Sequence, residues 1–296
     1  MTHTLTETTL HGLPVLRIET PLCTAQLSLY GGQLLSFVPA GGADVLWLSP
    51  LAQGTPKAIR GGVPVCWPYF AREHQPADAI QHGFARISPW TLAEAREDGD
   101  GNVHLTLDLP AHASTPLRLK QTLVLGAGLQ QALTTHNPSA EAVAFTDALH
   151  SYFHVGDVRQ VRLSGLDGLD YDDKFTGRTF PQSGDWTLSD PRDPGRSDRI
   201  YHDAGGHYVL HDPVLSRQLR ISTTGSRSVV VWNPGQAGAQ TMADVPDDAW
   251  PAFVCVEAAN AGRDVIELAP GASHTLGQAV EVLPASAASA SRRPPA

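Results

Sequence analysis

Cysteine is scarce in this 296-residue sequence. The three cysteines, Cys23, Cys66 and Cys255, lie far apart and form no C-x-x-C pair. Such a sparse, odd number argues against a disulfide-stapled scaffold and against a zinc finger built from thiolates, and it is typical of proteins from a reducing compartment. We therefore expect a cytoplasmic protein.

Lysine and long apolar runs are also scarce. Only three of the 21 basic residues are lysines, and 30 acidic residues bring the net charge to −9, so the sequence has no basic field to attract nucleic acid or an anionic membrane. No uncharged apolar run approaches the roughly 18 residues that a membrane span needs. The first nineteen residues lack the basic start and apolar stretch of a signal peptide. We expect no nucleic-acid partner and no membrane partner.

What the sequence contains instead is short apolar–polar alternation, interrupted by glycine, proline, aspartate and asparagine. Strands repeated every 8–12 residues or so, with turn signals between them, are typical of an all-β sandwich or barrel. The clearest hairpin turns are residues 98–102 and 126–128. The expected strands are Leu13–Glu19, Thr24–Tyr30, Gln33–Val38, Asp44–Leu48, Thr91–Ala95, Val103–Leu109, Leu117–Leu125, Leu129–His136, Ala142–Phe153, Val158–Ser164, His207–Leu210, Arg217–Ser222, Ser228–Trp232, Ala252–Glu257 and Thr275–Leu283.

Helical signals are weak along the chain. The best short candidate is Met242–Ala249, where Asp244 would cap the first turn. No repeat and no change in composition divide residues 6–283, so we expect a single domain there. From residue 284 the chain becomes a low-complexity run of alanine, serine, arginine and proline, and we expect residues 284–296 to be a disordered tail.

Two connections are longer than ordinary hairpin loops, residues 55–90 and residues 180–195. The first is rich in glycine, proline, aromatic residues and arginine, and long structured loops on a rigid β scaffold often carry function. Arg60 precedes two glycines that permit close approach of the backbone to a ligand, and arginine can grip an anion through two parallel bonds. His82 and Arg86 lie in the same loop. An anion site is one interpretation, and surface arginines paired with acids are the other.

Glu257 and His150 each follow an apolar run, which makes them candidates for proton transfer. A buried carboxylate is costly unless it is paired or used, and desolvation makes it a stronger base near neutral pH. Histidine is the usual proton donor in that pH range. The structural alternatives are a strand-end glutamate that emerges into solvent and a core histidine bonded to a main-chain carbonyl.

The thirteen histidines raise the question of a metal site. The near-pairs are His150/His154, His202/His207 and His207/His211. In a strand, residues four apart share a face but lie about 13 Å apart, which is too far to bind one ion. We expect no metal site and no cofactor.

Taken together, these motifs resemble the glucose-6-phosphate 1-epimerases, or hexose-6-phosphate mutarotases, a branch of the aldose 1-epimerase family with the galactose-mutarotase-like fold. The matching blocks occur in the family's order and span most of the chain. They are Ile59–Pro68, Gln81–Arg86, His150–Phe153, Asp198–Tyr201, Val231–Pro234 and Phe253–Glu257. The chain departs from the family pattern at Tyr69–Ala71 and Gly235–Gln236, which affects the finer shape of the sugar pocket.

The resemblance implies one large antiparallel β-supersandwich with few short helices. It implies that His150 is the general acid and Glu257 the general base. The partner would be a small-molecule sugar phosphate, bound by a monomer. The residues implied to bind the substrate are Arg60, Gln81, His82, Arg86 and Asp198.

The implied reaction interconverts the α and β anomers of an aldohexose 6-phosphate, with glucose 6-phosphate as the expected substrate, by acid–base ring opening without a cofactor. Three alternatives stay open: a 1-epimerase of unphosphorylated sugars, a non-catalytic carbohydrate-binding β-sandwich, and a cupin-like metal enzyme. Fold alone does not separate an enzyme from a binding module, but a binding module has no need of an acid and a base at one sugar ring, so convergence of His150 with Glu257 would argue against it.

Overall fold

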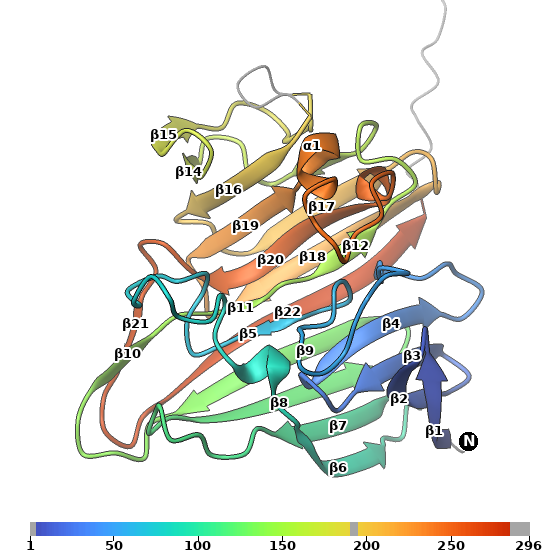
Figure 1. The fold of residues 1–296 in the computed structure, drawn as a ribbon. Helices are drawn as coiled ribbons and strands as arrows, with labels where there is room; N and C mark the ends of the chain where they lie inside the picture. The colour runs from blue at the N-terminus through green and yellow to red at the C-terminus, as the bar shows by residue number, and fades with distance from the viewer. Residues whose placement is uncertain (1–3, 190–194, 285–296) are drawn as a thin grey trace, which may run out of the picture.

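The computed structural model describes residues 4–189 and 195–284, and antiparallel β-strands build most of the fold (Figure 1). One eight-stranded sheet carries Glu257 and Asp198, and we call it the site sheet. It runs in the order β15 (Arg178–Pro181), β14 (Asp170–Asp173), β16 (Ser197–His202), β19 (Ser228–Asn233), β20 (Phe253–Asn260), β11 (Asp147–Leu149) and β5 (Val65–Cys66), and β12 (Tyr152–His154) also pairs with β20.

A second eight-stranded sheet, which we call the long sheet, packs behind the first. It runs in the order β13 (Arg162–Ser164), β17 (His207–Asp212), β18 (Arg217–Thr224), β22 (Ser273–Pro284), β9 (Leu129–His136), β8 (Arg118–Leu125), β7 (Val103–Asp108) and β6 (Thr91–Glu97). Two small sheets join β1 (Thr4–Leu10), β2 (Leu13–Glu19), β3 (Cys23–Ser28) and β4 (Gln33–Pro39), and pair β10 (Val143–Phe145) with β21 (Ile266–Leu268).

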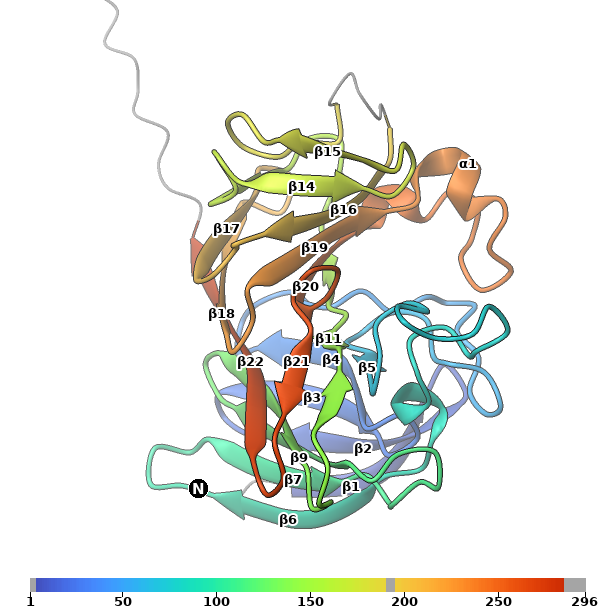
Figure 2. The ribbon, with the colours of Figure 1, turned by 90° about the vertical axis from the view of Figure 1, so that its left-hand side faces the viewer.

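The two large sheets share one apolar core because alternate residues of each strand point toward the other sheet. Val254 and Val256 of β20 belong to a buried hydrophobic cluster that also contains Leu219 of β18 and Leu276 of β22. Figure 2 shows β18 and β22 of the long sheet beside β19 and β20 of the site sheet. The opposite face of β20 is buried as well, since loops cover it, and this second face carries Glu257.

The expected all-β class with few short helices is confirmed. Several strand boundaries differ from those expected. Residues 142–153 form three short strands and not one, because strand pairing is interrupted at Thr146 and again at His150 and Ser151. Residues 44–48 make only isolated bridges. The charged strands β14, β15 and β16 were missed because they lack apolar alternation. Pro284, which we expected to begin the tail, belongs to β22, and residues 285–296 lie outside the described part of the chain.

The helix expected at Met242–Ala249 was wrong. Those residues form turns. The short helix α1 spans Gly235–Ala239 instead, and 3₁₀ turns occur at Ala85–Ile87 and Trp250–Ala252. The side chain of Asp244 does not cap a helix, because its carboxylate binds Arg60. Among the described residues, we find no helix long and apolar enough to cross a membrane.

Asp147 is a buried carboxyl group in β11, three residues before His150. It is fully buried, and neither carboxylate oxygen has a hydrogen-bond partner among the described residues. Burial, and then the negative charge of Asp264, raises the pKa of Asp147 well above its usual value. The folded protein therefore holds this proton up to a higher pH than the unfolded chain does. Its contribution to stability is complete below the unfolded pKa of about 3.9 and is lost as the pH rises through the folded pKa.

We therefore expect Asp147→Asn to be more stable than the wild type at pH 8 and nearly equal to it at pH 4. The expected rise in Tm at pH 8 is roughly 2–4 °C, which corresponds to about 1 kcal/mol in a protein of this size. Thermal unfolding of both proteins across this pH range measures the difference, and Asp170→Asn on the exposed edge is the control. A Tm difference that does not grow with pH would show that Asp147 is compensated in the fold.

Candidate active site

The pairing of β11 and β12 with β20 places a histidine opposite a glutamate. Pairing is interrupted at His150 and Ser151, but the register is the same on both sides of this break. The flanking pairs are Leu149 with Ala258 and Tyr152 with Cys255. His150 therefore lies opposite Glu257. Directly opposite residues of antiparallel strands point to the same face, with Cβ atoms about 4.5–5.5 Å apart.

The neighbouring strands bring further side chains to this face. Cys255 of β20 is in register with Trp232 of β19, which is in register with Asp198 of β16. Because residues two apart in a strand share a face, this row lies beside Glu257. The sheet itself therefore gathers Asp198 and the catalytic candidates on one surface.

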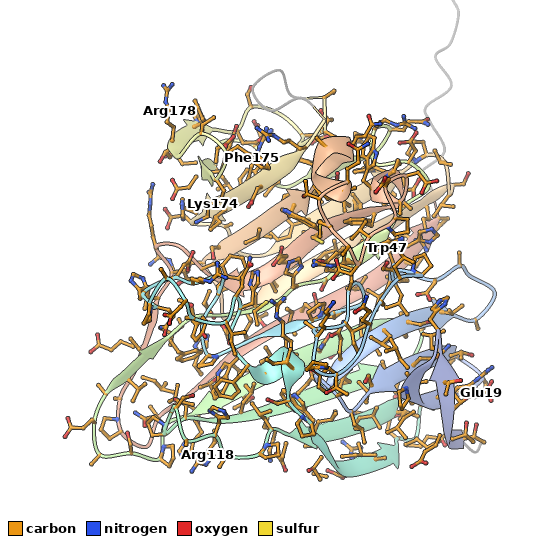
Figure 3. All side chains as sticks on the ribbon, in the orientation of Figure 1. Glu19, Trp47, Arg118, Lys174, Phe175 and Arg178 are labelled. Carbon is orange, nitrogen blue, oxygen red and sulfur yellow. The ribbon has the colours of Figure 1, made fainter. Side chains whose placement is uncertain are left out.

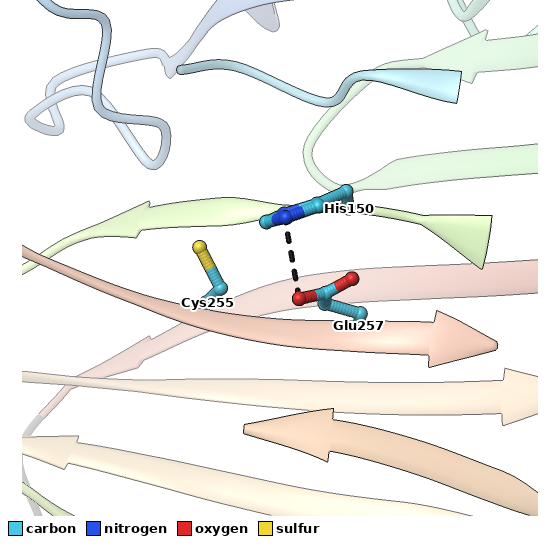
Figure 4. A group of neighbouring side chains, drawn as sticks. All are labelled: His150, Cys255 and Glu257. Carbon is cyan, nitrogen blue, oxygen red and sulfur yellow. Dashed lines mark ion pairs between the residues drawn. The ribbon is translucent and has the colours of Figure 1, made fainter. Parts of the chain in front are cut away.

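The imidazole Nδ1 of His150 lies 3.4 Å from carboxylate Oε1 of Glu257 (Figure 4). The two residues are 8% and 1% exposed. Within the described part of the chain, neither this Nδ1 nor Oε2 of Glu257 has a hydrogen-bond partner. The His150 ring stacks on Tyr152 with centroids 4.9 Å apart and an interplanar angle of 8°. The stacking fixes the plane of the ring.

Burial drives both groups toward their neutral forms, because desolvation disfavours charge. Burial, and then the positive charges of Arg86 and Arg60, lowers the pKa of His150 to about 3. Burial, and then the negative charge of Asp198, raises the pKa of Glu257 well above its usual value, and Arg86 only partly offsets this. At neutral pH the imidazole is therefore uncharged, and the carboxyl group of Glu257 holds its proton up to a higher pH than a solvated glutamate does.

Asp198 is the second carboxyl group on this face. Burial raises its pKa to about 6, with a small opposing effect from Lys174 and a further rise from Asp173. Its main-chain oxygen accepts a hydrogen bond from the main-chain nitrogen of Lys174 at 2.9 Å. Asp198 therefore changes charge near neutral pH.

The long loop of residues 55–90 forms the wall opposite the sheet. Arg60 donates from Nε to Asp244 at 3.1 Å and from Nη1 to the Tyr152 hydroxyl at 2.8 Å. The His82 ring lies edge-on to that of His150 with centroids 5.6 Å apart. Arg86 donates from Nη2 to the main-chain oxygen of Gln81 at 2.8 Å, so it braces the loop in this structure.

Two glycines allow close backbone contacts, one between this loop and β4 and one within the loop. Gly62 has φ +62°, and a Cβ there would lie 2.3 Å from the Leu34 carbonyl oxygen. Gly83 has φ +68°, and a Cβ there would lie 2.1 Å from the Trp67 carbonyl oxygen. No side chain fits at either place, so glycine is what allows the close backbone contact.

The sheet and the loop enclose a cavity of about 390 Å³, within the roughly 300–1,000 Å³ typical of small-molecule sites. It is lined by six of the seven residues identified from the sequence, namely Arg60, Gln81, His82, His150, Asp198 and Glu257. The seventh, Arg86, supports the wall through Gln81.

Lys174, Trp232 and Met242 also line this cavity, and the sequence analysis assigned them no role. Lys174 directly follows the charged strand β14. In Figure 3 its label lies near β14, well away from that of Trp47. Its Nζ is 3.7 Å from Glu73. Trp232 lies in one of the matching sequence blocks, which was the available signal, whereas nothing in the sequence marked Lys174.

His150, Cys255 and Glu257 are the described residues that could jointly hold a metal ion, since their donor atoms lie within 4.8 Å of one another. A metal would need the thiolate form of Cys255. Burial, and then the negative charge of Glu257, raises the pKa of this thiol well above its usual value. The arrangement therefore favours proton exchange between His150 and Glu257.

Comparison with known proteins identifies the family of this chain. The family model described as Aldose 1-epimerase matches residues 14–281. A relative from Salmonella typhimurium, named "Putative glucose-6-phosphate 1-epimerase", is 37% identical over 266 residues, which cover 87% of this chain and 86% of the relative. A relative of the same name from Escherichia coli is 38% identical over 261 residues, covering 85% and 84%.

Solved structures show the same fold. A crystal structure from Salmonella typhimurium described as "a putative mutarotase (YeaD)" is 34% identical, with a TM-score of 0.85 over 95% of this chain and 94% of that one. A galactose mutarotase-like protein from Clostridium acetobutylicum is 14% identical, with a TM-score of 0.72 over 95% and 99%. The expected galactose-mutarotase-like fold is thereby confirmed. Because the family model covers nearly the whole described chain and the relatives align over most of their length, the protein belongs to the aldose 1-epimerase family of isomerases.

Proposed function

We propose that the protein interconverts the α and β anomers of an aldohexose 6-phosphate, and that glucose 6-phosphate is its substrate. The observation that carries the proposal is the His150–Glu257 pair, a carboxyl group and an imidazole 3.4 Å apart in a cavity of sugar size. The names of the relatives from Salmonella typhimurium and Escherichia coli support the choice of sugar phosphate.

The reaction needs two proton transfers. Glu257 removes the proton from the anomeric hydroxyl, the bond from C1 to the ring oxygen breaks as the carbonyl forms, and His150 protonates the ring oxygen. After the carbonyl turns over, the ring closes with the two roles exchanged. Each positioned proton transfer contributes about 10²–10⁴-fold to the rate.

The pair acts as one unit with one shared proton. Burial favours the protonated form of Glu257 in the empty site, whereas ring opening needs Glu257 as the base and His150 as the proton donor. The 3.4 Å between Nδ1 of His150 and Oε1 of Glu257 is longer than a hydrogen bond, so a direct transfer needs a small approach of the two groups. Apparent pKa values seen in kinetics therefore belong to the pair and not to either residue.

The phosphate would be held by cations of the cavity wall. Arg60 lines the cavity and presents a planar guanidinium, which suits a phosphate dianion better than a point charge does. Arg86 lies behind it in the same loop and contributes positive charge to the His150 surroundings. These groups offset the net charge of −9, which disfavours an anionic substrate at long range.

Two rivals make different use of the same cavity. A 1-epimerase for unphosphorylated sugars would keep the acid–base pair but would gain nothing from the cationic wall. A carbohydrate-binding module would bind sugar without proton transfer. Both can be separated from the proposal by measuring exchange on phosphorylated and free sugars.

We expect the purified protein to accelerate anomer exchange of glucose 6-phosphate in the presence of a chelator, as measured by exchange NMR. Glu257→Gln and His150→Asn should each lower the rate by at least about 10²-fold, because each nearly preserves shape and removes one proton-transfer group. Circular dichroism establishes that the variants are folded. Exchange at the buffer rate for every hexose phosphate would favour the binding module, and a folded Glu257→Gln with near wild-type rate would remove Glu257 from the mechanism.

Removal of the Arg60 guanidinium should weaken the sugar phosphate and spare the neutral sugar. A charge-assisted bond contributes about 1.5–3 kcal/mol, so Arg60→Ala should lower kcat/KM for glucose 6-phosphate by roughly 10–150-fold. Arg60→Lys should recover only part of the loss.

Because Arg60 also binds Asp244 and Tyr152, its loss could act through the fold. In that case glucose and glucose 6-phosphate would lose activity together and the Tm would fall. Rates on both sugars, measured on a variant of known Tm, separate the two roles. Equal losses on the two sugars would remove the phosphate assignment.

Asp198 should produce an acid limb in the pH profile. We propose that it accepts hydrogen bonds from sugar hydroxyls as a carboxylate, and its pKa of about 6 means that this form is lost as the pH falls through 6. The value of kcat/KM should therefore drop between pH 7 and pH 5. Asp198→Asn should be less active at pH 7 and should lack this drop. A wild-type profile that is flat from pH 7 to pH 5 would contradict the role.

A further inference from the structure

A line of buried side-chain amides crosses the long sheet and ends beneath the candidate site. Gln278 of β22, Gln131 of β9 and Gln121 of β8 are 4%, 2% and 0% exposed. Nε2 of Gln278 donates to Gln131 at 3.2 Å, Nε2 of Gln131 donates to Gln121 at 2.7 Å, and Nε2 of Gln121 donates to the Gly32 carbonyl oxygen at 2.6 Å. At the other end, the Ser151 hydroxyl donates to Oε1 of Gln278 at 2.8 Å.

The line has a single direction. A carbonyl oxygen such as that of Gly32 can only accept, so each amide must donate toward it and accept from the other side. Oε1 of Gln278 is therefore directed at Ser151, and the serine must supply the proton. Head-to-tail hydrogen bonds of this kind also polarise and strengthen one another.

Ser151 is the point at which β11 ends and β12 begins. Its main-chain nitrogen donates to the Leu149 oxygen at 2.9 Å, and its main-chain oxygen accepts from the Val256 nitrogen at 3.2 Å. It directly follows His150, and Val256 directly precedes Glu257. Ser151 thus bonds to β11 and to β20, next to His150 and Glu257.

Stability alone does not account for the amide line. A buried hydrogen bond contributes about 1 kcal/mol net, and replacing both partners by apolar groups of the same shape is often nearly neutral. What hydrogen bonds of fixed direction add is one defined arrangement of the groups that they join. Here that arrangement includes the break in the strand.

We propose that Gln278 is a positioning residue for the acid–base pair: by holding Ser151 it sets the break between β11 and β12 that aims the His150 ring at Glu257. Gln131 and Gln121 keep the Gln278 amide in the required orientation. Gln278 lies on the long sheet, behind the site sheet, so it acts through Ser151. This inference rests on the proposed function, because it assigns a kinetic role to the spacing of that pair.

The test compares Gln278→Met with the wild type on glucose 6-phosphate. Methionine nearly preserves the volume and cannot accept the Ser151 hydrogen bond. We expect kcat to fall about 10-fold and KM to stay within twofold, since displacement of reacting groups by 1 Å can cost up to about 10²-fold in rate. Ser151→Ala removes the same bond from the other side. The double variant should be no slower than the slower single variant, because all three proteins lack the same bond.

Gln182→Met is the matched control. Gln182 is also buried and accepts hydrogen bonds from Tyr201 and Arg199. It directly follows β15 in the sequence, at the far edge of the site sheet from β11 and Ser151. We expect it to lower the Tm about as much as Gln278→Met does and to leave kcat within twofold of the wild type. A purely structural role for Gln278 predicts the same result for both glutamine variants.

The NMR signal of the His150 ring CH group provides a measurement that needs no turnover. It should shift in Gln278→Met and in Ser151→Ala, and stay unchanged in Gln182→Met. A wild-type kcat in folded Gln278→Met, or an unmoved His150 signal, would overturn the proposal, and Ser151→Ala gives the same test if Gln278→Met does not fold. Absence of anomer exchange in the wild type would instead overturn the proposed function, while the His150 signal would still test the positioning.

Discussion

The register between β20 and the interrupted strand β11–β12 fixes the spacing on which the site depends. A slip of one residue would send Glu257 to the opposite face of the sheet, away from His150. Val254 and Val256 oppose such a slip, because they are packed into the core shared with the long sheet. The apolar side of β20 thus sets the position of the polar side, and core packing and site geometry are properties of the same eight residues.

Burial gives the site its electrostatic character. His150 and Glu257 lie in a low-dielectric environment where both neutral forms are favoured, and the nearby guanidiniums of Arg60 and Arg86 work further against a charged imidazole. Charge that develops on a reacting sugar is poorly screened in such surroundings. The same desolvation that makes a carboxyl group costly in a strand makes it able to exchange protons near neutral pH.

The all-β fold class was predictable from local patterns, because apolar–polar alternation marks strands. A polar residue after an apolar run marks a candidate for proton transfer, although the structure places Glu257 inside β20 and not at a strand end. Glu257 and His150 both carried that signal. Their placement opposite each other depends on pairing between strands far apart in the sequence, which no local pattern specifies. Lys174 could not be predicted because it reaches the cavity from a charged strand without alternation. The helix at Met242–Ala249 was wrong because the cap-like Asp244 is recruited by Arg60, from a distant loop.

The glycines at positions 62 and 83 have a consequence for how ligands arrive. Gly62 seats the loop of residues 55–90 on the backbone of Leu34, and Gly83 joins two parts of the loop at Trp67, so closely that a methyl group fits at neither contact. A segment held in this way is a poor flap, since lifting it would break several main-chain contacts at once. The cavity is in this respect preformed: its shape exists before any sugar enters. A sugar that fits it loses its own conformational freedom on binding, but the protein loses little.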